Sequence, residues 1–259
     1  MESGLEVRHE GPVAHIVLSR PELRNAFNAE LIGALQRAFD ALAADGSVRA
    51  IVLSGAGKVF CGGADINWMR SSLDLSEDDN VEDARRLSRL LRTVNAVPKP
   101  VIGRVHGAAL GGGAGLAAVC DVVVAATQTQ FGFTETKLGI LPAVISPFVM
   151  AKIGLSHARA LCLTGERFDA GRAFDIGLVH EVVPEELLDD AVKRVAGEVL
   201  TASPSGVAAT KALLAEVSQT RFDDTLEMTA RAIARQRVSE EGQEGLRAFL
   251  ERRKPTWTA

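Results

Sequence analysis

Residues 101–133 read VIGRVHGAALGGGAGLAAVCDVVVAATQTQFGF, and the choice of fold class rests on them. An apolar run at Val101–Val105 leads into the glycine run Gly107–Gly115, and a second apolar run follows at Asp121–Ala125. Short apolar runs bounded by turn residues are typical of buried strands, and Leu116–Val119 continues the glycine run as a short helical segment. The order strand, helix, strand predicts an α/β protein.

The residues before this stretch repeat the same order. Val13–Leu18 and an apolar segment before it predict two strands joined by a turn at Gly11-Pro12. Asn28 can cap a helix whose apolar positions recur at helical spacing until Gly46, and Arg49–Ser54 predicts the next strand. This recurrence favours an α/β fold of stacked ββα turns.

One segment between these units is strongly acidic. Residues 71–83, SSLDLSEDDNVED, are expected to form a solvated, mobile loop. Ala84–Ala96 then predicts a helix that ends before Pro98 and Pro100, because proline resists helix continuation.

The chain changes character after Ile145. Apart from a short strand expected at Leu178–Val182, the remaining residues predict helices, which are Glu185–Ala202, Pro204–Val217, Thr225–Gln236 and Glu240–Arg253. We place a boundary near residue 195, with residues 1–195 as one unit and residues 196–259 as a helical segment. This segment is too short for a core of its own, so we expect it to pack on the first unit or on another subunit.

The composition excludes several classes of protein. Lys and Arg number 29 against 33 Asp and Glu, a net charge of −4, which offers no basic surface for a nucleic acid. Charges interrupt the N-terminal residues, and no run approaches the roughly 18 apolar residues of a transmembrane helix, so neither export nor a membrane partner is expected. The three cysteines lack CxxC spacing, which predicts no disulfide framework, no metal site and a reducing, cytoplasmic setting.

The glycine run Gly107–Gly115 is a poor match to a dinucleotide-binding fingerprint. The strand after it ends at residues 125–128 without the carboxylate that would bind a ribose. A second glycine-rich segment, GAGKVFCGGAD at residues 55–65, lacks the Ser or Thr and the first glycine of a phosphate-binding loop. Each segment follows a strand and can bring backbone N–H groups close to a ligand oxygen, so the two together predict an oxyanion hole.

Three motifs in order make the chain recognisable. FCGGADINWM at 60–69, VHGAALGGGAGLAAVCD at 105–121 and FGFTETKLGILPA at 131–143 resemble the enoyl-CoA hydratase/isomerase (crotonase) superfamily. Further matches at residues 24–26, 165–184 and 241–255 extend the resemblance over essentially the whole chain. It implies a crotonase-like spiral of stacked ββα units, with the coenzyme A and catalytic site in residues 1–195 and a helical trimerisation region in residues 196–259.

The resemblance assigns three catalytic residues. The backbone N–H groups of Ala64 and Gly112 would hold the thioester oxygen as it becomes enolate-like. Gly112 is expected to open a short helix, where its N–H has no partner within the helix. Glu135 in FTETK would be the general acid and base, and an apolar pocket would raise its pKa toward neutrality.

The resemblance also implies where the substrate binds. Arg24 is a candidate contact for the coenzyme A phosphates, and Phe249 and Arg252 would close over the adenine from a neighbouring subunit of a trimer or of a hexamer built from two trimers. Phe249 is equally consistent with plain helix packing. Coenzyme A is part of the substrate, and no separate cofactor or metal is expected. The remaining substrate-binding candidates are Ala26, Gly62, Gly63, Asp65, Ile66, Gly111, Gly115 and Leu141.

Two departures from the family pattern bear on the reaction. Gly115 stands where well-known hydratases of the family have a second glutamate, which leaves a hydratase, an isomerase with one carboxylate and a noncatalytic acyl-CoA-binding protein as alternatives. PAVISPFVMAKIG at 142–154 and the C-terminal residues 238–257 are similar to bacterial methylglutaconyl-CoA and isohexenylglutaconyl-CoA hydratases. We therefore expect a branched enoyl-CoA, with or without a distal carboxylate, from leucine or related catabolism. Lys137 is consistent with a solvated surface residue.

Overall fold

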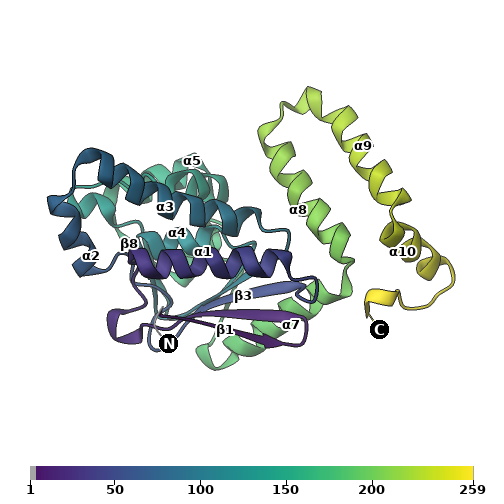
Figure 1. Cartoon of the computed structure of the whole chain (residues 1–259), viewed down its shortest axis with the longest axis horizontal. Helices are drawn as coiled ribbons and strands as arrows, with labels where there is room; N and C mark the ends of the chain where they lie inside the picture. Colours follow the sequence, from purple (N-terminus) through teal and green to yellow (C-terminus); the bar gives the residue numbers. More distant parts are fainter. Residues whose placement is uncertain (1–3, 259) are drawn as a thin grey trace.

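The structure is a computed structural model that describes residues 4–258 (Figure 1). Within these residues the strands are β1 Leu5–Glu10, β2 Val13–Leu18, β3 Ala50–Gly55, β4 Val101–Val105, β5 Ala108–Leu110, β6 Val122–Ala126, β7 Gln130–Gly132, β8 Arg167–Asp169 and β9 Glu181–Val183. The α-helices are α1 Ala29–Ala44, α2 Ile66–Ser71, α3 Glu77–Ala96, α4 Gly112–Ala118, α5 Ser146–Thr164, α6 Ala170–Asp175, α7 Leu188–Thr201, α8 Pro204–Gln219, α9 Thr225–Val238 and α10 Glu240–Leu250.

The strands form two sheets. The larger sheet has the order β1-β2-β3-β4-β6-β9, in which β1 and β2 are an antiparallel hairpin and the other neighbours are parallel. The smaller sheet has the order β5-β7-β8. The parallel strands of the larger sheet, from β2 onward, are connected through helices and through the small sheet, which confirms the predicted α/β class.

Helices cover both faces of the larger sheet (Figure 1). The helix α1 begins where expected, because the Asn28 side chain accepts a hydrogen bond from Leu31 N at 2.8 Å. Its apolar residues join α3 and the inner side chains of β2 and β3 in the main core. On the opposite face, Leu188 and Val192 of α7 pack on Val52 and the strands beside it in a second apolar cluster. No helix in the described chain combines the length and the apolar character that crossing a membrane requires.

Two expectations from the sequence were wrong. The acidic residues expected in a mobile loop instead enter the short helix at Ser72–Asp74 and the first turns of α3. The side chain of Ser76 caps α3, and Glu77 and Asp78 lie in its first turn, where negative charge is favourable. After Ile145 the chain contains the additional strand β8, which completes the small sheet.

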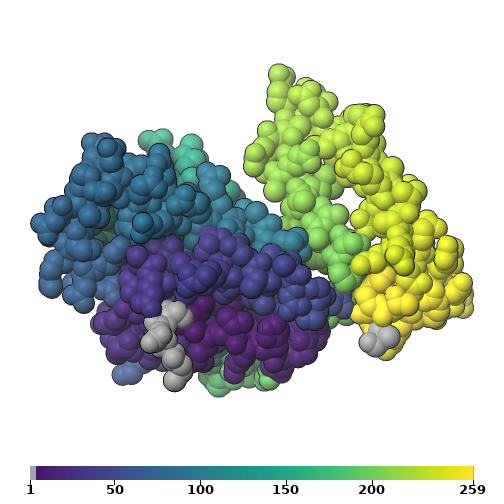
Figure 2. Space-filling model, viewed as in Figure 1, coloured from purple at the N-terminus to yellow at the C-terminus, as the bar shows by residue number. Residues whose placement is uncertain are grey.

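The helices after residue 203, α8–α10, form an arm that stands apart from the rest of the molecule (Figures 1 and 2). Arg49 of the main body holds both ends of this arm, because its guanidinium donates to the carbonyl oxygens of Ala202 and Trp257. Lys211 on α8 adds an ion pair to Asp121 at 2.7 Å. Because α7 packs on the sheet, it belongs structurally with the main body although it crosses residue 195; the domain boundary stays a prediction.

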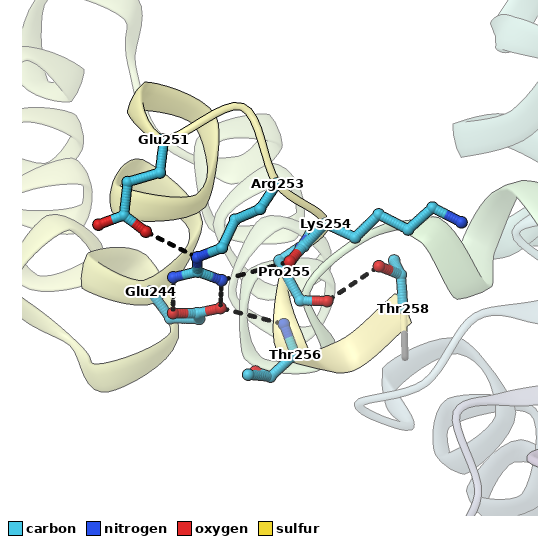
Figure 3. Close-up of polar contacts among 7 residues, drawn as sticks. All are labelled: Glu244, Glu251, Arg253, Lys254, Pro255, Thr256 and Thr258. Carbon is cyan, nitrogen blue, oxygen red and sulfur yellow. Dashed lines mark hydrogen bonds and ion pairs between the residues drawn. The ribbon is translucent and has the colours of Figure 1, made fainter.

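Polar contacts also fold the end of the arm back on itself (Figure 3). Arg253 donates to both carboxylate oxygens of Glu244 and to Glu251, and the same Glu244 accepts from the backbone N of Thr256. In contrast, α8 and α9 bury none of their side chains. The large apolar side chains that the arm leaves exposed are Leu214, Phe222, Leu226, Ile233, Val238, Leu246, Phe249 and Leu250.

Candidate active site

Two glycine-rich loops meet beside the carboxyl ends of parallel strands. The residues after β3 run alongside β5, with Cys61 N donating to Ala108 O and Leu110 N donating to Cys61 O, both at 3.1 Å. Their approach leaves no room for side chains, since a Cβ at Gly113 would lie 2.8 Å from Cys61 Cβ. Gly63, at φ 101°, has a backbone conformation that other residues rarely adopt. The sequence thus brings the two predicted N–H donors into one region.

The direction of the Ala64 N–H follows from its neighbours. Gly63 O accepts a hydrogen bond from Phe27 N at 2.7 Å, and Asp65 N donates to Phe27 O at 2.8 Å. In a trans peptide the C=O and the following N–H point in opposite directions. Because the Gly63 carbonyl points toward Phe27, the Ala64 N–H points away from it, and within residues 4–258 it donates to no backbone acceptor.

The same argument sets the Gly112 N–H. Gly111 O accepts from Gly115 N at 3.0 Å along the axis of α4, so the Gly112 N–H points out of the start of that helix. Gly111 itself has φ 50° and caps the helix without a side chain. Phe27 supports both donors, since its ring lies 3.1 Å from where a Cβ on Gly112 would stand.

Glu135 lies against this second loop. It begins a short 3-10 helix, Glu135–Leu138, and its Oε1 lies 3.3 Å from where a Cβ on Gly111 would stand. The turn is held against α5 because Thr136 Oγ1 donates to Cys162 O at 2.9 Å. Loss of hydration on burial raises the pKa of Glu135, although its own backbone N–H opposes that shift. Its Oε2 is buried without a hydrogen-bond partner in the described structure, so this oxygen is free to accept a proton from a bound ligand.

Gly115, one helical turn after Gly111 on α4, faces the apolar side chain of Ile145. A Cβ at this position would overlap the side chain of Ile145, whose Cβ would be only 2.8 Å away. Ile145 is 2 % exposed and belongs to the main core. A glutamate at position 115 would therefore need a different residue at 145, so the glycine and the isoleucine form a matched pair.

The predicted contacts for coenzyme A lie partly beside these loops. Arg24 packs along Gly62, whose N–H donates to Arg24 O at 2.8 Å, and Ala26 follows two residues later. Ile66, at the start of α2, is 74 % exposed and available to a ligand. The carboxylate of Asp65 is instead bonded within the protein, to Arg20 and to Asn67 N.

Three other predicted residues belong to segments outside the two loops. Leu141 is 75 % exposed in the segment between the Glu135 turn and α5. Phe249 is 80 % exposed on α10, and Arg252 follows that helix with φ 56°. Phe249 and Arg252 belong to the arm, whose helix α10 lies far from α4 and α5, the helices next to Glu135 (Figure 1), so one chain does not bring them to Glu135. The roles of all the named site residues stay predictions.

Asn25 lies within the family match at residues 24–26, but the sequence did not indicate a role for it. Asn25 is fully buried with φ 54°, and its amide donates to Ala56 O and Val59 O, both at 2.8 Å. It therefore ties the N-terminal segment to the first glycine loop. Its position directly before Ala26 and its tolerance of a left-handed conformation were the available signals.

Comparison with known proteins identifies close relatives. The family model described as Enoyl-CoA hydratase/isomerase matches residues 8–259. Crotonyl-CoA hydratase of Syntrophomonas wolfei is 36% identical over 95% of this chain and 94% of its own. 2,3-dehydroadipyl-CoA hydratase of Escherichia coli is 34% identical over 98% of both chains. The crystal structure of an enoyl-CoA hydratase from Shewanella pealeana superposes with a TM-score of 0.95 at 39% identity, covering 98% of this chain and 96% of that one.

Proposed function

The chain belongs to the enoyl-CoA hydratase/isomerase family and has its crotonase-type α/β fold, and on this premise we propose that it adds water across the 2,3 double bond of an enoyl-CoA thioester. The observation that carries the proposal is the position of Glu135. Its carboxyl group lies against Gly111, directly before the outward-pointing N–H of Gly112. A proton carrier and an anion-stabilising donor therefore occupy the same loop.

The two backbone amides account for activation of the substrate. When a nucleophile adds to C3 of a conjugated thioester, negative charge develops on the thioester oxygen. The N–H groups of Ala64 and Gly112 would stabilise this oxyanion, and both are held in direction before the substrate binds. Such preorganised donors favour the transition state over the bound substrate, because the charge they stabilise is not yet present in the substrate.

Glu135 accounts for the proton transfers. As an ionised carboxylate it would accept a proton from water while the water oxygen bonds to C3, and it would return that proton to C2 of the enolate. No net proton is gained or lost in this sequence. Burial supports the role, because it raises the pKa of Glu135 toward the range in which a carboxyl group both accepts and donates protons.

An isomerase reaction is the alternative that a specific observation favours. Ile145 occupies the space beside Gly115, so only one carboxylate is available where the second would stand in a two-glutamate hydratase. A single carboxylate can move a proton from one carbon to another without water. A noncatalytic acyl-CoA-binding protein is less well supported, since it would not require the buried, unpartnered oxygen of Glu135.

For the substrate we propose a branched enoyl-CoA, with 3-methylglutaconyl-CoA of leucine degradation as the first candidate. The support is the resemblance of residues 142–154 to hydratases of that branch. A relative named for 2,3-dehydroadipyl-CoA, which carries a distal carboxylate, is consistent with an acidic acyl chain. The three cysteines, none of them in a disulfide, support a cytoplasmic setting.

We further propose that the chain forms a homotrimer or a hexamer of two trimers. The arm supports this assembly, because α8 and α9 bury no side chain within the chain. Leu226 and Val238 of α9 are 75% and 78% exposed. A hollow of about 1060 Å³ lies between α8 and α9 on one side and the main body on the other, beside the Lys211–Asp121 contact. A second copy packed against the arm would bury these exposed side chains, and it would give Phe249 and Arg252 a route to a neighbour's coenzyme A.

A screen of acyl-CoA thioesters read by mass spectrometry tests the function. Incubation with crotonyl-CoA and 3-methylglutaconyl-CoA in water enriched in ¹⁸O should yield a product heavier by one labelled water, with loss of the conjugated thioester absorbance. A product of unchanged mass with a moved double bond would establish the isomerase instead. Binding of coenzyme A thioesters without turnover of any would overturn both reactions.

A further inference from the structure

Resting on the proposed function, we propose that Arg20 is a positioning residue for the reaction, which acts through Asp65 to keep the Ala64 amide aimed at the thioester oxygen. Neither the charge nor the position of Arg20 identifies it in the sequence, because 45 residues separate it from Asp65. The structure brings the two together under the first glycine loop.

The Arg20 guanidinium spans both segments that flank the Ala64 amide. Its Nη2 donates to Asp65 Oδ2 at 2.8 Å, and its Nη1 donates to Ala26 O at 2.7 Å. The side chain of Arg20 is 15% exposed and that of Asp65 is 6% exposed, so solvent screens the pair only weakly. Arg20 thus fastens the residue before Phe27 to the residue after Ala64.

These contacts add to the pairing that sets the amide direction. Phe27 holds the loop through Gly63 O and Asp65 N, on the two sides of Ala64. Asp65 Oδ1 also accepts from Asn67 N at 2.8 Å, which caps α2. With Arg20 removed, Asp65 would keep the cap but lose its tie to the Ala26 segment, and the loop could rotate about the Phe27 pairing.

Arg20 also has an electrostatic effect at this site. Burial acts to raise the pKa of Asp65, but the hydrogen bonds from Asn67 N and Arg20 outweigh burial and hold the pKa below its usual value, so the group is a carboxylate. An unpaired carboxylate one residue from Ala64 would repel the negative charge that develops on the thioester oxygen. The Arg20 cation neutralises it, and a lysine could reach only one of the two acceptors.

The test compares Arg20→Gln, Arg20→Lys and Asp65→Asn with the unaltered protein. We expect kcat for the best enoyl-CoA of the screen to fall about 10- to 100-fold in Arg20→Gln, because a misaimed donor loses much of the effect of an oxyanion hole, while KM changes far less. Arg20→Lys should recover part of kcat. Asp65→Asn keeps a cap for α2 and loses the tie to Arg20 without leaving an unpaired carboxylate, so kcat should fall in the same direction but less than in Arg20→Gln, which keeps the test decisive if Arg20→Gln fails to fold.

A spectroscopic measurement separates positioning from a general structural role. Butyryl-CoA labelled with ¹³C at the thioester carbonyl cannot be hydrated, and its carbonyl stretch should shift to lower frequency when it binds the unaltered protein. This shift should shrink in Arg20→Gln and recover partly in Arg20→Lys. Arg104→Gln breaks a more exposed ion pair, to Asp189 of α7, in which the Arg104 side chain is 22% exposed and that of Asp189 is 67% exposed, and it should leave the shift unchanged.

The outcomes distinguish this proposal from the proposed function. A full shift in Arg20→Gln, with or without a lower kcat, would overturn the positioning role and leave the function intact. Equal decreases of the carbonyl shift in Arg20→Gln and Arg104→Gln would show that Arg20 contributes only to stability, and this result would also overturn the positioning role. Absence of a shift in the unaltered protein would refute the oxyanion hole itself.

Discussion

The paired glycine loops and the C-terminal arm stabilise their backbones in different ways. In the loops, buried groups from several segments hold each other in place, with Phe27, Asn25 and Arg20 bonded to residues 56–65. In the arm, a few polar contacts at its two ends set its shape, while its apolar side chains remain exposed. The loops are held by contacts within one chain, whereas the exposed apolar side chains of the arm are the surface that the proposed assembly would bury.

The largest expected effect concerns the loops. Glu135→Gln removes the proposed proton carrier without changing its shape, and kcat should fall about 10³- to 10⁴-fold, toward the upper range for loss of a general acid or base. Steady-state kinetics with the best enoyl-CoA of the screen measures this. The matched variant Glu166→Gln, on an exposed residue, should retain full activity. Full activity in Glu135→Gln would remove the proposed base.

The next largest effect concerns the arm. Replacing exposed Leu226 and Val238 with Asp should weaken self-association by about 10²-fold or more, since each buried aliphatic side chain contributes about 1.5–3 kcal/mol. Analytical ultracentrifugation over a range of concentrations should show a shift from the assembly to single chains. The far-ultraviolet circular dichroism should not change, because neither side chain is buried within its own chain. An unchanged mass would contradict the proposed interface.

Close packing of the loops should be visible in stability. Gly113→Ala places a methyl group against Cys61 and should lower the free energy of unfolding by about 1–3 kcal/mol. Gly197→Ala, at a helical position of α7 with no atom within 4 Å, should raise it by about 0.5–1 kcal/mol. Urea denaturation of both variants measures the difference. Equal effects would show that the loops are less tightly packed than described.

The loops should also have a distinctive pH dependence. The pKa of Glu135 is raised in the folded state from 4.5, chiefly by burial, so its favourable contribution is complete below about pH 4.5 and is lost as the pH rises through the raised value. Glu135→Gln lacks this loss and should be more stable than the unaltered protein at neutral pH, with the difference vanishing in acid. Thermal unfolding at several pH values measures it, and a stability advantage that persists in acid would contradict the assignment.

The smallest expected effect lies in the arm, where the pKa of a glutamate is lowered instead of raised and stability is therefore lost in acid. Hydrogen bonds from Arg253 lower the pKa of Glu244 from 4.5 to about 2 (Figure 3), so this contribution is present above pH 4.5 and is lost as the pH falls toward 2. Both side chains are partly exposed, Arg253 at 40% and Glu244 at 20%, so salt should screen the effect. The protection of residues 250–257 from hydrogen exchange, taken relative to the intrinsic rate at each pH, should fall in acid in the unaltered protein but not in Glu244→Gln. Identical profiles would show that the pair is without consequence.

Local sequence patterns predicted most of the helices and strands. The prediction for residues 71–83, which rested on their acidic composition alone, was wrong. Asn28 was expected to cap a helix and does so. The acidic run after Ser71 was expected to be a loop because of its charge, yet the same charges stabilise the first turn of α3 behind the Ser76 cap. Residues whose action depends on distant partners carried no local signal. Ile145 contacts Gly115 across 30 positions, and Arg20 reaches Asp65 across 45.

The sequence alone, through patterns among neighbouring residues, determined the α/β class, the glycine-rich turns after strands and the carboxylate in FTETK. These features depend on periodicity, on caps and on glycine's access to positive φ, all of which act within a few residues. Assembly of the chain in three dimensions set the direction of the two amides, the burial of Glu135 and the barrier beside Gly115. An N–H points where its peptide plane is held, and the groups that hold these planes come from segments far apart in the chain.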